Sequence, residues 1–164
     1  MGKRGAPAQE AQPSPDDRVI AVNRRARHDY HLEETYEAGL VLTGTEIKSL
    51  RAGHVSLVDS HAFIEHGEAW LYDMHIAPYE HGNRFNHDPR RRRKLLLHKE
   101  EIDRMFQKAR LQGYTLIPTR IYLKRGRAKV EIAVARGKKQ YDKRHAIAER
   151  EAKRRIERAL KQRD

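Results

Sequence analysis

The chain has 164 residues, of which 38% are hydrophobic and 35% charged, and its net charge is +12. The lack of cysteine excludes disulfides, thiolate catalysis and the common structural zinc sites. No stretch approaches the ~20 apolar residues of a membrane span, and the N-terminus has no signal-type apolar segment. We therefore expect a cytoplasmic protein with an anionic partner: nucleic acid first, then an anionic membrane surface, then an acidic protein.

The first seventeen residues differ from the rest in composition. Residues 1–17 hold three of the six prolines and no aromatic residue, so they cannot bury enough apolar surface to offset the entropy of ordering. We predict a disordered leader there. The folded body begins near Arg18 with an apolar run over 19–22, and Asn23 is placed to cap the basic turn at 24–27.

The next segment predicts a strand followed by a short helix. Residues 30–42 alternate in the manner of a strand, and Gly39 inside that run indicates a bulge or bend. Residues 45–51 predict a short helix, which Gly53 ends in the left-handed conformation.

The middle of the chain predicts two hairpins separated by a loop and a helix. Residues 56–74 predict the first hairpin, and 81–89 are polar and turn-rich. Apolar residues recur at helical spacing over 99–112, and Gly113 ends that helix. Residues 121–134 alternate on both sides of a Gly-containing turn, which predicts a hairpin with one apolar and one polar face.

These elements add up to a mainly β fold with flanking α-helices. Five or six short strands and two short helices in about 120 residues are typical of an OB-like antiparallel β-barrel, which we place at 18–136. The remaining basic tail is 137–164. It has eleven basic residues against five acidic ones and a thin apolar stripe, so we predict that it is disordered or frayed alone and helical when bound to a polyanion.

Enzymatic function is the first alternative to binding. Ten histidines are present, but they lie apart, and no His-Glu-x-x-His, Gly-rich phosphate loop or Gly-x-Ser-x-Gly motif occurs. Glu33, Glu34 and Glu37 could hold a hydrolytic pair, yet such residues more often form a solvated strand face. We predict no catalytic residue, no metal and no cofactor, and we keep Glu37 as an acceptor for base edges or ribose hydroxyls.

Two basic patches are candidates for RNA contact. The run Arg90–Lys94 is the denser one, and three leucines that follow it would anchor it to the barrel; a solvated loop and a phosphate contact both remain open. The other patch is the hairpin face that carries Lys124, Arg125, Arg127 and Lys129. Tyr122 lies beside it. Cations that hold phosphate next to a ring that stacks on bases suit single-stranded or looped RNA.

Five sequence blocks occur in order along the chain: Asn23–Tyr30, Glu37–Gly39, Leu42–Gly53, Arg93–His98 and Gly137–Arg144. Within them, Glu-x-Lys-Ser-Leu-Arg-Ala-Gly and Gly-Lys-Lys-x-x-Asp-Lys-Arg are specific patterns. The set resembles the signature of the SmpB family, also called SsrA-binding proteins, and the resemblance extends from about Val19 to Asp164.

The resemblance implies an OB-like barrel that binds the tRNA-like domain of transfer-messenger RNA. Family residues important for that contact match Glu37, Leu96 and Lys129. With the basic residues of the first block and of the hairpin, the expected RNA-binding set is Glu37, Leu96, Lys129, Arg24, Arg25, His28, Lys124, Arg125 and Arg127.

The resemblance also assigns a role to the tail. The block at 137–144 is implied to reach the decoding centre of a ribosome that lacks a codon, and the rest to lie in the empty mRNA channel. Tyr141 stands where some members carry histidine, which keeps a ring able to stack. The expected tail contacts are Gly137, Lys138, Lys139, Tyr141, Asp142, Lys143, Arg144, Lys153, Arg154, Ile156 and Leu160.

The implied function is rescue of stalled ribosomes by trans-translation, without catalysis. The implied partners are transfer-messenger RNA and small-subunit ribosomal RNA, with elongation factor Tu and alanyl-tRNA synthetase reached through the RNA, and no membrane. Two alternatives remain: a general OB-type chaperone for single strands or tRNA, and a basic nuclease or deaminase with a histidine site.

Overall fold

The structure is a computed structural model that describes residues 18–79 and 88–162, and for residues 139–147 it describes the backbone alone. The predicted leader and most of the predicted loop at 81–89 lie outside the described residues. The same holds for the side chains of five predicted tail contacts: Lys139, Tyr141, Asp142, Lys143 and Arg144.

The elements follow one another in this order: β1 (Arg18–Val22), α1 (Arg24–Asp29), β2 (Tyr30–Leu40), α2 (Gly44–Arg51), β3 (Val55–Ser56), β4 (His61–Glu65), β5 (Glu68–Tyr72), β6 (His75–Ile76), β7 (Arg93–Leu96), α3 (Lys99–Ala109), β8 (Tyr114–Lys124), β9 (Arg127–Gly137) and α4 (Lys138–Lys161).

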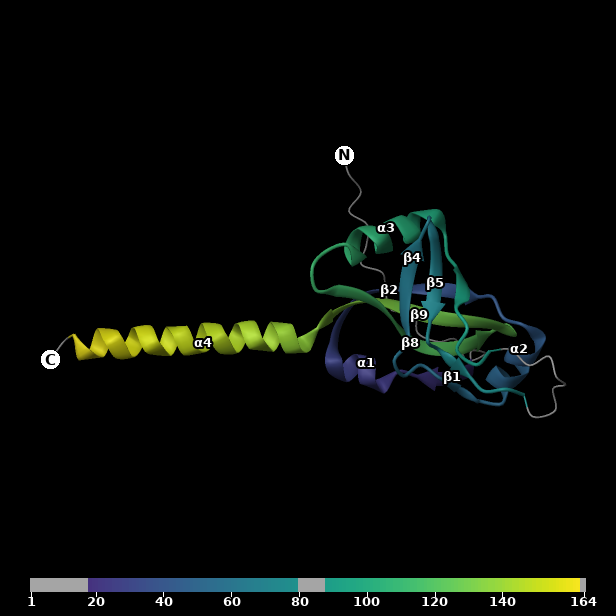
Figure 1. Ribbon diagram of the computed structural model, residues 1–164, viewed down its shortest axis with the longest axis horizontal. Helices are drawn as coiled ribbons and strands as arrows, with labels where there is room; N and C mark the ends of the chain where they lie inside the picture. The colour runs from purple at the N-terminus through teal and green to yellow at the C-terminus, as the bar shows by residue number, and fades with distance from the viewer. Residues whose placement is uncertain (1–17, 80–87, 163–164) are drawn as a thin grey trace.

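Six strands close into a ring, in the order β8, β4, β5, β7, β2, β9 and back to β8. Every pairing in the ring is antiparallel. β1 extends the sheet beyond β8, and β3 and β6 form a separate two-stranded ribbon. Figure 1 shows the helices flanking this barrel. The predicted fold class, an OB-like antiparallel barrel with flanking helices, is confirmed.

Both predicted hairpins form, and each turns through two residues with positive φ. In the β8–β9 hairpin these are Arg125 (φ 51°) and Gly126 (φ 76°), and in the β4–β5 hairpin they are His66 (φ 51°) and Gly67 (φ 74°). Two such residues match the right-handed twist of the flanking strands. The turns therefore fix the register of both hairpins.

The predicted bulge in β2 lies elsewhere than expected. The register shifts between Leu32 and Thr35, whereas Gly39 pairs regularly with Lys129 of β9 and Leu96 of β7. A Cβ atom at Gly39 would lie 3.2 Å from the Leu96 Cβ. The glycine therefore serves the close approach of β7 to β2, not a bend.

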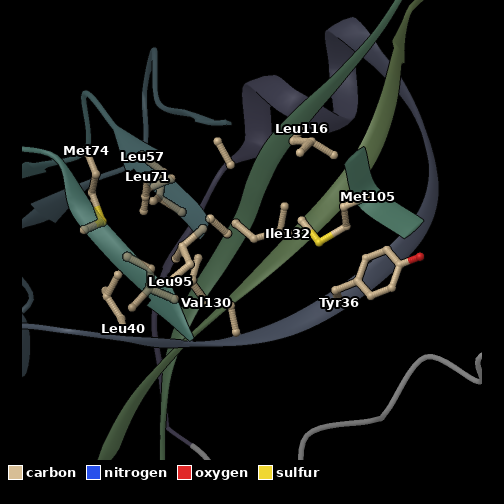
Figure 2. Close-up of a cluster of buried hydrophobic side chains, with 14 of the residues drawn as sticks. Tyr36, Leu40, Leu57, Leu71, Met74, Leu95, Met105, Leu116, Val130 and Ile132 are labelled. Carbon is tan, nitrogen blue, oxygen red and sulfur yellow. The ribbon is translucent and has the colours of Figure 1, made fainter. Parts of the chain in front are cut away.

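The core fills the barrel with aliphatic side chains from most strands, as Figure 2 shows for Leu71, Leu95, Val130 and Ile132. α3 contributes Met105, which is fully buried. Burying a leucine- or methionine-sized side chain stabilises a fold by about 1.5–3 kcal/mol. This packing holds the outer faces of the strands in fixed positions.

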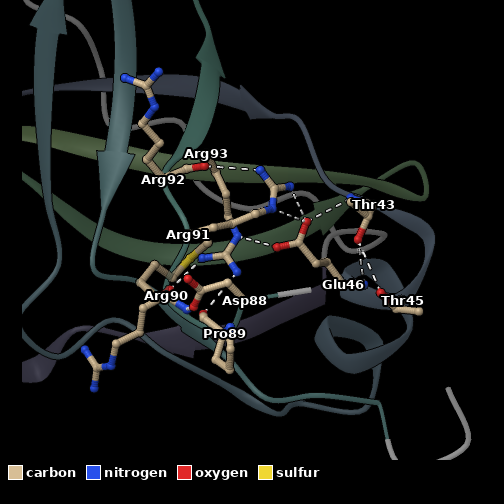
Figure 3. Close-up of polar contacts among 10 residues, drawn as sticks. Thr43, Thr45, Glu46, Asp88, Pro89, Arg90, Arg91, Arg92 and Arg93 are labelled. Atoms are coloured by element: carbon tan, nitrogen blue, oxygen red, sulfur yellow. Dashed lines mark hydrogen bonds and ion pairs between the residues drawn. The ribbon is translucent and has the colours of Figure 1, made fainter. Parts of the chain in front are cut away.

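A buried ion pair fastens α2 to β7. Glu46 of α2 and Arg93 of β7 are both fully buried, and Arg93 Nε donates to Glu46 Oε2 at 2.5 Å. Arg93 also donates to the carbonyl oxygens of Met74 (2.6 Å) and Pro89 (3.1 Å), and Arg91 donates to the other Glu46 oxygen. Figure 3 shows both arginines converging on the one carboxylate.

The charge state of Glu46 follows from these contacts. Burial alone would raise the pKa of its carboxyl group, but hydrogen bonds from the Thr43 backbone, Arg91 and Arg93 outweigh it and lower the pKa below its ordinary value. Thr43 is also the N-cap of α2 and forms a capping box with Glu46. Glu46 thus stays ionised as the electrostatic anchor of α2.

The basic run Arg90–Lys94 is largely committed to such internal contacts. Besides Arg91 and Arg93, Arg92 lies 4.3 Å over the Trp70 ring, and Lys94 Nζ lies 3.3 Å from Glu68. Of the two alternatives left open for this run, phosphate contact is excluded for the buried Arg93 and is less favoured for its neighbours, which already have partners.

The tail forms a single helix, α4, that projects away from the barrel (Figure 1). Residues 148–162 are exposed throughout, and Ile156 and Leu160 are each 61% exposed. The helical form predicted for the tail against a polyanion is the form seen here, and its disorder in the free protein stays a prediction. Helices shorter than ~12–15 residues are marginal in isolation, and α4 has 24 residues.

Candidate nucleic-acid interface

Three predicted RNA-binding residues meet at one place on the barrel. Glu37 lies on β2, Leu96 on β7 and Lys129 on β9, and β2 pairs with both other strands. The three side chains line an open hollow of about 530 Å³, together with Leu97, His98 and Glu101. Residues that are far apart in the sequence thus form one surface, which we call the β2 hollow.

Glu37 is held in place by two donors from β8. The Tyr122 hydroxyl donates to Glu37 Oε2, and Lys124 Nζ lies 3.4 Å from the same oxygen. Tyr122 is only 4% exposed, and burial, followed by the hydrogen bond to Glu37, raises the pKa of its hydroxyl. The hydroxyl therefore remains a donor, and the Glu37 carboxylate is fixed as an acceptor at the edge of the hollow.

Leu96 supplies the apolar part of the hollow. Its side chain is 55% exposed, although the adjacent residue Leu95 is buried in the core. The alternation of β7 turns every second residue outward, and Gly39 leaves room beside it. An apolar side chain held out in this way suits contact with the face of a base or a ribose.

The cations that are available for phosphate lie at the β8–β9 hairpin. Among the described residues, Arg125, Arg127 and Lys129 have no side-chain hydrogen bond or ion pair with the rest of the fold. The cations of the Arg90–Lys94 run, by contrast, are largely engaged. Cations without a carboxylate partner bind phosphates most favourably, because no ion pair has to be broken first. The β8–β9 hairpin is therefore a better phosphate site than the Arg90–Lys94 run.

The prediction that Tyr122 stacks on a base is wrong. Its ring is buried, and Arg120 lies over it with 5.1 Å between the guanidinium carbon and the ring centre. A register shift in β8 between Pro118 and Arg120 separates this strand end from the regular alternation. The alternation in the sequence placed Tyr122 on the polar face of the hairpin. It could not reveal that the ring is buried on that face.

The predicted RNA-binding residues of α1 lie at the other end of the barrel. α1 precedes Tyr30, which pairs with Gly137 at the base of the tail, and Lys138 Nζ donates to the Arg27 carbonyl at 3.2 Å. The predicted residues on α1 are Arg24, Arg25 and His28. These residues lie on a helix next to the base of the tail, and the structure does not bring them together with the β2 hollow.

Two of these α1 residues are held by carboxylates. Arg25 lies 3.8 Å from Asp29 and 3.7 Å from Asp59, and His28 Nδ1 lies 2.8 Å from Asp29. Arg24 has no such partner among the described residues. Of the three predicted α1 residues, Arg24 is therefore the one best placed to meet an anionic partner.

The acidic cluster of β2 does not form a carboxylate pair. Glu33 accepts a hydrogen bond from Tyr114 at 2.9 Å, and Glu34 accepts one from Tyr36 at 2.7 Å, while Glu37 is bound to Tyr122. Each carboxylate is thus assigned to a different tyrosine. Among the side chains that the structure describes (18–79, 88–138 and 148–162), no group of His, Asp and Glu is arranged to hold a metal ion, and no described helix is long and apolar enough to cross a membrane.

Comparison with known proteins decides the family. A family model described as SmpB protein matches residues 20–162. The chain belongs to the SmpB family. The SsrA-binding protein of Thermobifida fusca (strain YX) is 65% identical over 146 residues, which cover 89% of this chain and 91% of the relative. That of Roseiflexus castenholzii is 64% identical over 148 residues, covering 90% and 94%.

A solved structure places the fold in the same SmpB family. A chain of the structure "tmRNA-SmpB: a journey to the center of the bacterial ribosome" is 56% identical, with a TM-score of 0.63. The match covers 73% of this chain and 83% of that chain. The resemblance of the five sequence blocks to the SmpB signature is thereby confirmed.

Proposed function

We propose that this SmpB-family chain binds the tRNA-like domain of transfer-messenger RNA and delivers it to ribosomes stalled without a codon in the A site. The observation that carries this is the β2 hollow, where Glu37, Leu96 and Lys129 meet beside uncompensated cations. Relatives named SsrA-binding proteins and a homologous chain from a structure named for tmRNA and SmpB on the ribosome support it.

The barrel, residues 18–136, grips the RNA by shape and charge. Lys129, Arg125 and Arg127 meet phosphates, Leu96 packs on a ribose or base, and the fixed Glu37 carboxylate accepts from ribose hydroxyls or base edges. Such mixed contacts recognise looped RNA better than uniform duplex. No bond is made or broken, so the chain acts as a binding protein and not as an enzyme.

The tail, residues 137–164, reports whether the mRNA channel is vacant. A vacant channel is a polyanionic groove, and the basic helix α4 gains phosphate contacts and counterion release inside it. A channel filled with mRNA excludes the helix sterically. The α1 cations adjoin the base of the tail and act with it. Elongation factor Tu and alanyl-tRNA synthetase are reached through the bound RNA, so the chain works where ribosomes do, in the cytoplasm.

The second candidate, a general OB-type chaperone for single strands or tRNA, is favoured by the same exposed cations. The two proposals differ in specificity. The rescue proposal predicts that the tRNA-like domain binds at least ten-fold tighter than an unrelated single strand of equal length at equal salt, since shape contacts add to charge. Filter binding or fluorescence anisotropy measures both constants, and equal affinities would favour the chaperone.

Loss of the Lys129 charge should weaken RNA binding and its salt dependence together. For Lys129→Ala we expect the slope of log affinity against log salt to fall in magnitude by roughly one, because one phosphate contact is lost. Lys108→Ala, at the end of α3 and outside the β2 hollow, is the matched control. A slope identical to that of the parent would remove Lys129 from the interface.

Loss of the Tyr122 hydroxyl should weaken RNA binding through Glu37. Tyr122→Phe keeps the buried ring but leaves the carboxylate with Lys124 as its remaining donor from β8. We expect the affinity for the tRNA-like domain to fall about five-fold, the equivalent of one ordinary hydrogen bond, and the loss to disappear in a Glu37→Gln background. Tyr36→Phe, which removes a hydroxyl from Glu34, is the control; equal losses in both backgrounds would contradict the coupling.

A further inference from the structure

The outer surface of the β4–β5 hairpin carries four aromatic rings. His61 and Phe63 come from β4 and pair with Tyr72 and Trp70 of β5, while the alternate residues point into the core. The His61 and Phe63 ring centres are 4.9 Å apart, those of Phe63 and Tyr72 5.6 Å, and those of His61 and Tyr72 6.0 Å. We call these four residues the aromatic face. Phe63 is 51% exposed.

Carboxylates surround the aromatic face and neutralise its cations. Glu65 lies 3.5 Å from Arg92 and also accepts from the Tyr72 hydroxyl at 2.8 Å, and Asp73 lies 4.0 Å from His61. Glu68 pairs with Lys94 and Asp59 with Arg25, at 3.3 and 3.7 Å. Carboxylates and cations are thus close to balance on this surface, although the net charge of the chain is +12.

This charge pattern disfavours RNA at the aromatic face. A surface that binds single-stranded RNA by stacking needs free cations beside its rings to hold the phosphates, as at the β8–β9 hairpin. Here the cations Arg92 and Lys94 already have carboxylate partners, and Glu65 and Asp73 would repel phosphate. Exposed aromatic residues and arginine in a charge-balanced setting are the composition of protein–protein interfaces.

A second hollow adjoins the face and indicates what kind of side chain fits there. It measures about 450 Å³, and its lining includes Asp29, Asp59, His61 and Phe63. Carboxylates next to ring faces attract cationic side chains. Arg25 reaches Asp59 loosely, at 3.7 Å, with its own side chain 67% exposed, so an incoming lysine or arginine can share or replace it there. Asp29 is more firmly engaged, with His28 Nδ1 at 2.8 Å.

We propose that the aromatic face docks a protein of the stalled-ribosome complex, through a segment that presents a lysine or arginine beside an apolar side chain. The basic side chain enters the hollow beside Asp59, and the apolar one packs on Phe63. The face is separate from the β2 hollow, because β7 lies between β5 and β2, so protein and RNA can be held together. This inference rests on the proposed function in ribosome rescue.

Site-specific photocrosslinking tests the inference on the whole complex. The photoreactive residue p-benzoylphenylalanine replaces Phe63 in one full-length variant and Leu96 in a second. A third carries it at Leu111, which is 52% exposed outside both surfaces. Each is assembled with purified transfer-messenger RNA, elongation factor Tu and ribosomes stalled on truncated mRNA. The crosslinked partner is assigned by its sensitivity to ribonuclease or protease and by mass spectrometry.

The expected result is a protease-sensitive crosslink from position 63 to a basic segment of one protein, and a ribonuclease-sensitive crosslink from position 96. A crosslink from position 63 to RNA or to this chain itself, or one no stronger than that from position 111, would overturn the inference. The proposed function would still stand in that case if position 96 crosslinks to RNA. Loss of the crosslink from 96 would instead count against the proposed function.

A surface substitution provides an independent readout. Phe63→Ala removes a half-exposed ring, and we expect binding of the tRNA-like domain to be unchanged while association with stalled ribosomes falls on the order of ten-fold, as for an interface hot spot. Leu111→Ala should change neither. Unchanged ribosome association of Phe63→Ala would contradict the role of the aromatic face.

Discussion

Removal of residues 138–164 is expected to abolish tagging of stalled chains while leaving the binding of transfer-messenger RNA within about two-fold of the parent. The β2 hollow and the β8–β9 hairpin lie on the barrel, and β9 ends at Gly137 before the truncation point. The exposed α4 contributes no packing from residues 148–162. The barrel should therefore fold and bind RNA without its tail.

The measurement pairs an affinity with an activity. Anisotropy with the tRNA-like domain gives the affinity, and a reconstituted system with truncated mRNA gives the yield of tagged product. A charge-reduced full-length variant, Lys153→Gln with Arg154→Gln, serves as an intermediate and should tag weakly. Tagging by the truncated protein at the parental level would refute the role of the tail.

Substitution of Glu46 is expected to cause the largest loss of stability of any single change discussed. Glu46→Ala leaves Arg93 buried without a counter-ion and removes an acceptor from Arg91. Breaking a buried pair in this way typically costs about 3–5 kcal/mol. The free energy of unfolding by urea at pH 7 measures it, and circular dichroism checks that the variant keeps its secondary structure.

A control variant at an exposed ion pair shows how much of this loss depends on burial of the Glu46–Arg93 pair. Glu68→Ala breaks the pair with Lys94, whose side chains are 48% and 41% exposed, and surface pairs contribute only about 0–1 kcal/mol. If Glu46→Ala destabilised the fold no more than Glu68→Ala does, the α2–β7 fastening would not depend on this ion pair.

The same ion pair predicts how stability depends on pH. The folded-state pKa of Glu46 is lowered, so its contribution is fully present above the unfolded pKa of about 4.3 and is lost as pH falls through the folded pKa. The difference in unfolding free energy between the parent and Glu46→Ala should therefore shrink below about pH 4. A difference that stays constant down to pH 2.5 would contradict this assignment.

Several elements could be predicted from the sequence because their signals are local. The turn at Arg125–Gly126 and the end of α2 at Gly53 depend on positive φ, which glycine adopts readily. Asn23 caps α1 through its side chain, which accepts from the Ala26 amide at 3.2 Å, and this too requires only neighbouring residues. Such features depend on a few residues of the chain and not on the rest of the fold.

Features that depend on long-range pairing were mistaken or left open. The partner of Arg93 is 47 positions away in the sequence, and that of Tyr122 is 85 positions away. Without the register of β2, β7 and β8, a basic run looks like a phosphate site and a strand tyrosine looks exposed. Gly39 was interpreted as a bulge for the same reason, since only the approach of Leu96 explains it.

The candidate site was predicted unevenly. Glu37, Leu96 and Lys129 were matched through family resemblance, and nothing in their spacing indicated that they would meet. The structure brings these three residues together, whereas the α1 cations lie near the base of the tail. The aromatic face went unrecognised, because alternating residues in β4 and β5 look like an ordinary hairpin until the pairing of Phe63 with Trp70 is known.

The accessibility of the tail on the ribosome tests the central claim most directly. Because the chain contains no cysteine, Ile156→Cys provides a single thiol on the exposed face of α4, and its rate of reaction with a maleimide can be followed on assembled complexes. With mRNA that ends in the P site we expect the thiol to be protected at least ten-fold relative to the free protein, and with mRNA that extends through the channel we expect the free rate. Equal reaction rates on both kinds of ribosome would contradict the claim that the tail detects a vacant channel.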